Sequence, residues 1–227
     1  MFDFGPFFDN IDLILEGFWA TVRLAAAAAV LSFILGTVLA SFRVAPIPVL
    51  RTFGTAYVNV VRNTPLTLVL LFCSFGLNDV LAMRLSGNSS TSYYWWAVFG
   101  LSAYTAAFVC EALRSGINTV PLGQAEAARS IGLTFTQSLR IIVLPQAFRA
   151  VIAPLGSVLI AMIKNTTVAA AASYAEAALV MKTILDAPSF TSGAIPLFIG
   201  VAVGFMILTL PTGFFFGWLH KRMAVAR

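Results

Sequence analysis

The chain has 227 residues, of which 59% are hydrophobic and only 10% carry a charged side chain. Soluble domains carry roughly 25% charged residues, so this composition and a mean hydropathy of +0.92 exclude a soluble globular protein. The net charge of +5 would favour a nucleic-acid partner in a soluble protein. Here the basic residues gather in particular connections between apolar runs, so the charge bears on membrane topology instead.

The N-terminal stretch, residues 1–17, is acidic and aromatic, and acidic side chains precede the first basic residue. A cleaved signal peptide begins with a positive region, so we expect this stretch to remain and to lie at the outer membrane interface. Apolar runs then follow, and a helix needs about 20 such residues to cross the bilayer. The sequence therefore predicts an all-α membrane protein with five transmembrane helices, near residues 18–42, 63–77, 93–110, 150–173 and 187–219.

The charges divide by side of the membrane. Basic residues follow the first, third and fifth predicted helices, whereas acidic residues dominate the N-terminal stretch and the second and fourth connections. By the positive-inside rule, we expect the N-terminus outside and the C-terminus in the cytoplasm. One transmembrane domain, residues 18–220, is then followed by a cytoplasmic tail, residues 221–227.

The third connection, residues 121–145, contains the most informative pattern in the chain. Helix formers after Pro121 predict a short helix that ends at Gly132, and Thr134 or Thr136 is expected to cap the next segment. Two short helices along the cytoplasmic surface would dock into a groove on another protein, although an ordinary interfacial helix is the alternative. The residues expected to make this contact are Glu126, Ala127, Ala128, Gly132, Leu144 and Pro145.

Ionisable groups inside membrane segments are functional candidates, because they are costly unless they are paired or hydrated. A zwitterionic substrate needs donors for its carboxylate, and Pro65 would free backbone groups beside such donors. The candidate substrate-binding residues are Arg62, Asn63, Thr64, Lys164, Asn165 and Thr166. The alternative is that the charges pair with one another, and the candidates for structural ion pairs are Glu111, Arg114 and Glu176.

The spacing of the third connection resembles the EAA loop of bacterial ABC-importer permeases. The stretches VRNTPL, YTAAFV and KNTT resemble the branch of that family that handles polar amino acids. Longer stretches, including AYVNVVRNTPLTLVLLFCSFGL and LRSGINTVPLGQAEAARSIGL, are similar to its glutamate-uptake permeases from actinobacteria. The resemblance spans roughly residues 15–220.

This resemblance implies a type I importer fold in a bacterial cell membrane. It implies a second permease subunit, identical or homologous, a cytoplasmic ABC ATPase dimer and an extracytoplasmic solute-binding protein. ATP and Mg would bind to the ATPase and no cofactor to this chain, which has no phosphate-binding loop motif and is expected not to be an enzyme. Glutamate is the expected substrate, with aspartate or glutamine as alternatives.

Two other classes of membrane protein fit the sequence less well. An ion-coupled secondary carrier also needs intramembrane charges, but it needs no docking loop, and it commonly has two comparable halves that this short chain lacks. A membrane-embedded hydrolase or metal enzyme is disfavoured, because His220 is the only histidine and lies at the C-terminal edge. The sequence therefore predicts no catalytic residue and no metal site.

Overall fold

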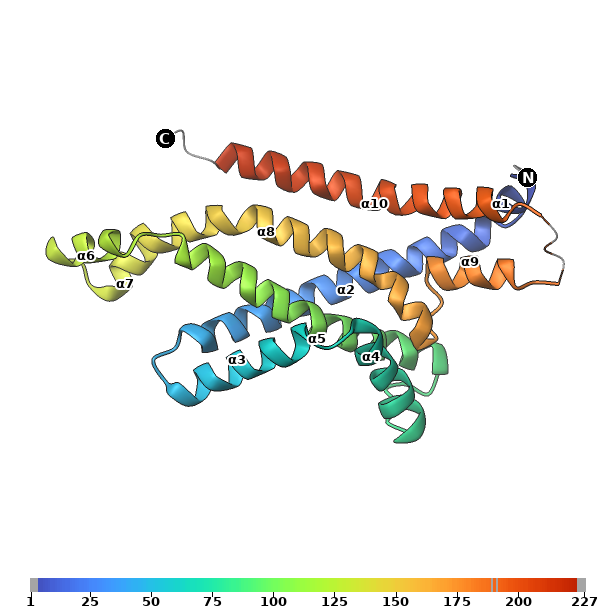
Figure 1. Ribbon diagram of the computed structural model, residues 1–227, viewed down its shortest axis with the longest axis horizontal. Coiled ribbons are helices and arrows are strands. Elements are labelled where there is room, and N and C mark those ends of the chain that lie inside the picture. The colour runs from blue at the N-terminus through green and yellow to red at the C-terminus, as the bar shows by residue number, and fades with distance from the viewer. Residues whose placement is uncertain (1–3, 189, 191, 224–227) are drawn as a thin grey trace.

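The computed structural model describes residues 4–188, 190 and 192–223, and within these residues every regular element is helical. Long helices lie side by side along one axis, and a shorter arm leaves the bundle (Figure 1). The elements are α1 (Gly5–Asp9), α2 (Ile11–Val44), α3 (Pro48–Arg62), α4 (Leu66–Leu71), the π-helix η1 (Phe72–Val80), α5 (Ser89–Asn118), α6 (Leu122–Ser130), α7 (Phe135–Ser138), the π-helix η2 (Leu139–Val143), α8 (Leu144–Asn165), the 3₁₀-helix η3 (Thr166–Ala172), α9 (Ala177–Leu185) and α10 (Ala194–Met223).

Four helical segments are long and apolar enough to cross a membrane: α2, α5, the segment Thr136–Ala172 that contains α8, and α10. A fifth span exists if α3 and the following α4–η1 segment count as one, and these two are bent by 102°. The predicted all-α membrane fold is therefore confirmed. The second predicted helix, residues 63–77, differs, because the chain breaks at Pro65, whose missing N–H and restricted neighbour interrupt a helix.

The first helix is longer than predicted. It begins at Ile11 rather than near Phe18, so part of the expected interfacial stretch forms its first turns. At the other end of the chain, α10 continues to Met223, which takes in the start of the predicted tail. The rest of that tail, residues 224–227, lies outside the described residues, as do residues 1–3.

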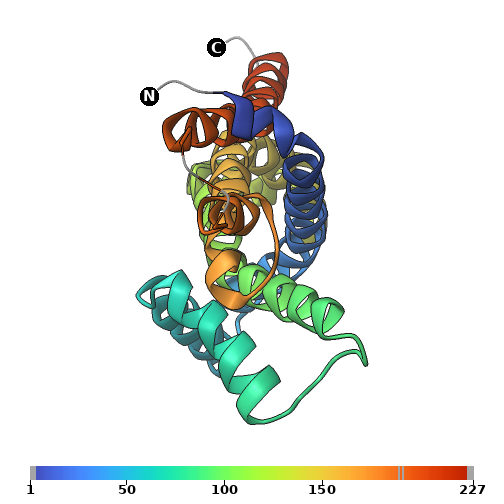
Figure 2. The ribbon, with the colours of Figure 1, turned by 90° about the vertical axis from the view of Figure 1, so that its right-hand side faces the viewer.

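Helix α5 lies at the centre and packs against both α2 and α8. Small residues allow these approaches, as is usual between membrane helices. A Cβ at Gly36 of α2 would lie 2.6 Å from Val109 of α5, and one at Gly116 of α5 would lie 2.9 Å from the carbonyl oxygen of Ala147. The end-on view shows α3 and the α4–η1 arm on one side of the bundle (Figure 2), where both pack against α5.

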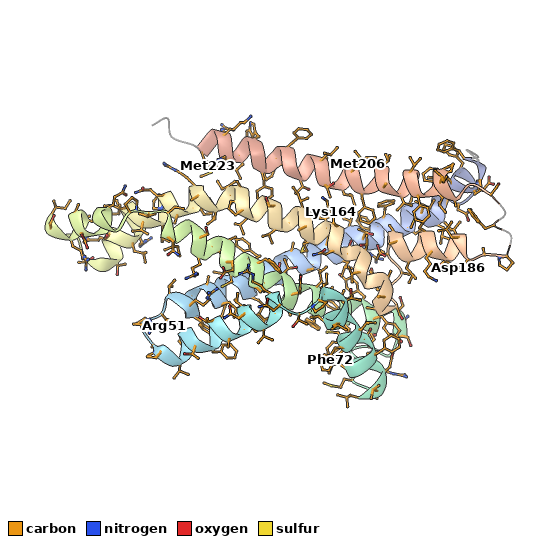
Figure 3. All side chains as sticks on the ribbon, in the orientation of Figure 1. Arg51, Phe72, Lys164, Asp186, Met206 and Met223 are labelled. Atoms are coloured by element: carbon orange, nitrogen blue, oxygen red, sulfur yellow. The ribbon has the colours of Figure 1, made fainter. Side chains whose placement is uncertain are left out.

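The two ends of the bundle differ in content. The α2–α3 turn, α6, α7 and the end of α10 lie at one end, while α1 and α9 lie at the other (Figure 1). Arg51 and Met223 mark the first end and Asp186 the second (Figure 3). Helices α5 and α8 both run to the first end, where α6, α7 and η2 connect them (Figure 1). Of α5 and α8, α8 alone has an internal proline, Pro154, which removes one hydrogen bond from its ladder.

Candidate functional site

The third connection forms the helix and turn that its sequence predicts. Helix α6 ends at Ser130, and Gly132 follows with a φ of +87°. The N–H of Gly132 donates to the carbonyl of Arg129 at 3.0 Å, and that of Leu133 donates to the carbonyl of Ala128 at 3.1 Å. These two bonds make a Schellman motif, whose left-handed position favours glycine. The expected stop at Gly132 is confirmed.

The next segment begins with a capping box at Thr134. The N–H of Gln137 donates to Thr134 Oγ1 at 3.3 Å, and the Gln137 side chain accepts from the Thr134 N–H at 2.9 Å. Of the two caps considered, Thr134 is therefore the one used. A further bond from Gln146 Nε2 to Gln124 Oε1, at 2.5 Å, ties α6 to the first turn of α8. Sequence reasoning missed this contact, because no local pattern pairs the two glutamines.

The predicted docking residues of the loop are mostly accessible. Glu126, Ala127, Leu144 and Pro145 are exposed, whereas Ala128 is only 2% exposed and packs inward. Ile131, which follows α6, is 77% exposed. The connection therefore presents exposed side chains around the turn at Gly132.

A cavity of about 380 Å³ lies between α5 and α8. Its lining residues are Tyr104, Thr105, Phe108, Ser157, Val158, Ala161, Met162 and Asn165. Thr105 is 3% exposed, and its hydroxyl is the one buried side-chain polar atom among the described residues without a hydrogen-bond partner. Buried polar groups are almost always hydrogen-bonded, so an unpartnered hydroxyl in a cavity wall indicates room for a polar ligand.

A second cavity is larger, at about 640 Å³, and lies between α2, α5 and α8, at the end of the bundle where α6 and α7 lie (Figure 1). It is lined mainly by apolar side chains, such as Val44, Leu113 and Phe148. A zwitterion needs several hydrogen-bonding partners, so the smaller and more polar cavity fits such a ligand better despite its size.

A group of charged side chains lies one helical turn beyond the smaller cavity, and we call it the Glu111 cluster. The Glu111 carboxylate accepts from Arg43 of α2 through Oε1 and from Arg62 of α3 through Oε2, the latter at 3.2 Å. Arg114 also lies 3.9 Å from Oε1. Three arginines against one carboxylate leave two positive charges in the cluster. Pairing of Glu111 with Arg62 and with Arg114 was expected from the sequence as the alternative to substrate binding, whereas the contact with Arg43 was missed.

The six predicted substrate-binding residues do not converge on one point. Asn165 lines the smaller cavity, and the Arg62 guanidinium lies 5.8 Å from the ring centre of Phe108, another lining residue. Lys164 is exposed on α8, near the middle of the bundle (Figure 3). The remaining three, Asn63, Thr64 and Thr166, donate from their side chains to carbonyls in the last turns of the helix that precedes each of them.

Glu176 does not form the ion pair that its sequence position suggested. It is fully buried, and its carboxylate accepts from the N–H groups of Ala178 and Leu179, each at 3.0 Å. It therefore caps the N-terminus of α9, and the neighbouring N–H of Ala177 donates to Thr21 of α2 at 3.2 Å. A cap satisfies a buried carboxylate without a cation, which explains the difference. Within the described residues, no group of side chains is arranged to hold a metal ion.

Comparison with known proteins decides the family. Residues 28–225 match the family described as "Binding-protein-dependent transport system inner membrane component". The chain belongs to this family. It is also 50% identical to the "Glutamate transport system permease protein GluC" of Corynebacterium efficiens, over 94% of this chain and 95% of that one. It is 35% identical to the "Probable glutamine ABC transporter permease protein GlnM" of Bacillus subtilis, over 95% of each chain.

Solved structures agree on the fold. A chain from the "Crystal structure of an amino acid ABC transporter with histidines" superimposes with a TM-score of 0.86 at 25% identity, covering 98% of this chain and 99% of that one. A chain of the MetNI methionine ABC transporter in an inward-facing conformation gives a TM-score of 0.74 at 19% identity, over 95% and 98%. The chain is therefore a multi-pass membrane permease with the type I ABC importer fold.

Proposed function

We propose that this chain is a permease subunit of an ATP-driven importer of acidic amino acids, with glutamate as substrate. The single observation that supports this most strongly is the 50% identity to a glutamate transport permease along almost the whole chain. The two surplus positive charges of the Glu111 cluster, one turn from the polar cavity, favour an anionic ligand in the same direction. An ion-coupled carrier has no such support, because membership of the permease family argues for a separate ATPase.

In this proposal the substrate occupies the cavity between α5 and α8. Asn165 and the unpartnered hydroxyl of Thr105 supply hydrogen bonds, and Arg62 at the rim supplies a charge for a carboxylate. Asn63, Thr64 and Thr166 act by holding the backbone at the α3–α4 break and at the end of α8, since their side chains are engaged there. Lys164 contributes a further positive charge nearby.

ATP would be hydrolysed, with Mg, in a cytoplasmic ABC ATPase dimer that docks on the loop between α5 and α8. The docking surface consists of Glu126, Ala127, Leu144 and Pro145 on the outside, fixed in shape by Ala128 and by the Gly132 turn. The basic end of the bundle then faces the cytoplasm and the N-terminus lies outside. A second permease subunit, identical or homologous, and an extracytoplasmic solute-binding protein complete the importer.

The test is uptake of labelled glutamate by proteoliposomes that contain this chain with its permease partner, ATPase and binding protein, with and without ATP on the ATPase side. We expect uptake that requires ATP, that excess glutamate competes away, and that arginine and histidine leave unchanged. Uptake of a different amino acid would retain the importer and reject the substrate. Uptake driven by an ion gradient without ATP would reject the importer.

A further inference from the structure

We propose that Glu111 is a positioning residue: it holds Arg62 in an ion pair until an acidic amino acid binds and Arg62 turns to the side-chain carboxylate of that amino acid. In this structure Arg62 pairs with Glu111, and on substrate binding it exchanges this carboxylate for that of the substrate. The inference rests on the proposed function, because it names the residue that would separate an acidic substrate from its neutral amide.

The exposure of the two arginine partners differs in the way that such an exchange requires. The Arg62 side chain is 44% exposed, whereas that of Arg43 is only 9% exposed. The stem of Arg43 also lies against α3, since a Cβ at Gly54 would come within 3.0 Å of Arg43 Cγ. Arg43 is therefore a fixed partner of Glu111, while Arg62 has the freedom to turn.

The exchange leaves no buried charge without a partner. Arg43 and Arg62 use different oxygens of the Glu111 carboxylate, and Arg114 lies 3.9 Å from the first of these. When Arg62 leaves, Glu111 keeps Arg43 and Arg114. A carboxylate with a single cation would instead lose its only partner, which is strongly unfavourable in a partly buried site.

Arg62 also has a path to the ligand. Its guanidinium already lies over the Phe108 ring, 5.8 Å from the centre, and Phe108 lines the cavity. An arginine on an aromatic face keeps a favourable contact while its planar donors turn between acceptors. Arg62 is also the last residue of α3, directly before the 102° bend. A change in the ion-pair partner of Arg62 therefore acts directly at this bend.

The test measures equilibrium binding of labelled glutamate and of labelled glutamine to the permease–ATPase complex in nanodiscs, without binding protein. Arg62→Gln should weaken glutamate binding by about tenfold or more and change glutamine binding less than about twofold. Glu111→Gln should tighten glutamate binding by about fivefold, because Arg62 is released from its ion pair. In the Arg62→Gln background, Glu111→Gln should no longer alter glutamate affinity.

Several results would overturn the inference. Equal weakening of glutamate and glutamine by Arg62→Gln would place Arg62 on the α-carboxylate or in a structural role only. An effect of Glu111→Gln that is the same with and without Arg62 would make Glu111 structural. If the Glu111 variant does not assemble, the Arg62→Gln comparison of the two ligands still decides, since that side chain is half exposed. If the variants give either of these results while the wild-type complex imports glutamate with ATP, the proposed function stands and only the role of Glu111 is rejected.

Discussion

Replacing Gly132 with valine tests whether the turn in the loop between α5 and α8 passes force from an ATPase. Gly132 has a φ of +87°, and an added Cβ would meet nothing within 4 Å. The substitution therefore imposes no clash, and its whole effect comes from the backbone conformation. Non-glycine residues rarely adopt this left-handed region, and β-branched residues adopt it least of all.

The size of the effect follows from that conformation. A non-glycine residue in the left-handed region costs about 1–2 kcal/mol, which corresponds to about a 5–30-fold change in the population of the turn. The two hydrogen bonds that close the Schellman motif, from Gly132 to Arg129 and from Leu133 to Ala128, would be lost in the same molecules. The bundle itself, which packs elsewhere, should keep its stability.

The assay compares labelled glutamate imported with ATP hydrolysed in the same proteoliposomes. We expect Gly132→Val to lower the ratio of transport to hydrolysis at least fivefold while the amount of assembled complex stays unchanged. Gly132→Asn should retain more coupling, because asparagine tolerates this region. Gly123→Ala is the matched control, since Gly123 lies in the same loop with equally open space but inside α6. Normal coupling in Gly132→Val would refute the reasoning.

Three further predictions concern the bundle. Gly116→Val should cost about 1–3 kcal/mol of stability and so lower the thermal unfolding midpoint of the purified complex, because its Cβ would lie 2.9 Å from the backbone carbonyl oxygen of Ala147. An unchanged midpoint would contradict this packing. Glu176→Ala should cost about 1–3 kcal/mol in the same measurement, since two capped N–H groups lose their acceptor, and Glu176→Gln should cost less. Thr105→Val should leave the midpoint equal or higher, as it removes an unpartnered hydroxyl, yet raise the KM for uptake about two- to tenfold. A Thr105→Val complex with lower stability and normal KM would show that the hydroxyl has a hidden structural partner.

Local chemistry made part of the molecule predictable. The stop at Gly132 and the cap at Thr134 each depend on residues within a few positions, so the sequence carries them directly, whereas the predicted helix 63–77 ran through the break at Pro65. The apolar runs likewise predicted the membrane fold. The ends of the helices were not predictable in this way, because α2 has 34 residues, more than the roughly 20 apolar residues that a crossing needs, and hydropathy marks only the apolar part of a helix.

The remainder depends on contacts between distant segments. Arg43 joins Glu111 across 68 positions, and no periodic pattern signals that pairing. The buried hydroxyl of Thr105 became notable only once its surroundings were known. Glu176 was expected to need a cation, yet the start of α9 provides two N–H donors instead. In each case the partner was set by how the helices cross.

The position of Pro154 has a mechanical consequence. Motion of the α5–α8 connection enters both walls of the cavity at once, through α5 on one side and α8 on the other. Along α8 the distance from Leu144 to Ser157 is about 20 Å, and Pro154 lies within it, whereas α5 contains no proline. The cavity thus has one stiff wall and one compliant wall. Under the proposed function, an equal displacement of both helices by the ATPase would bend α8 more than α5 and so change the width of the cavity.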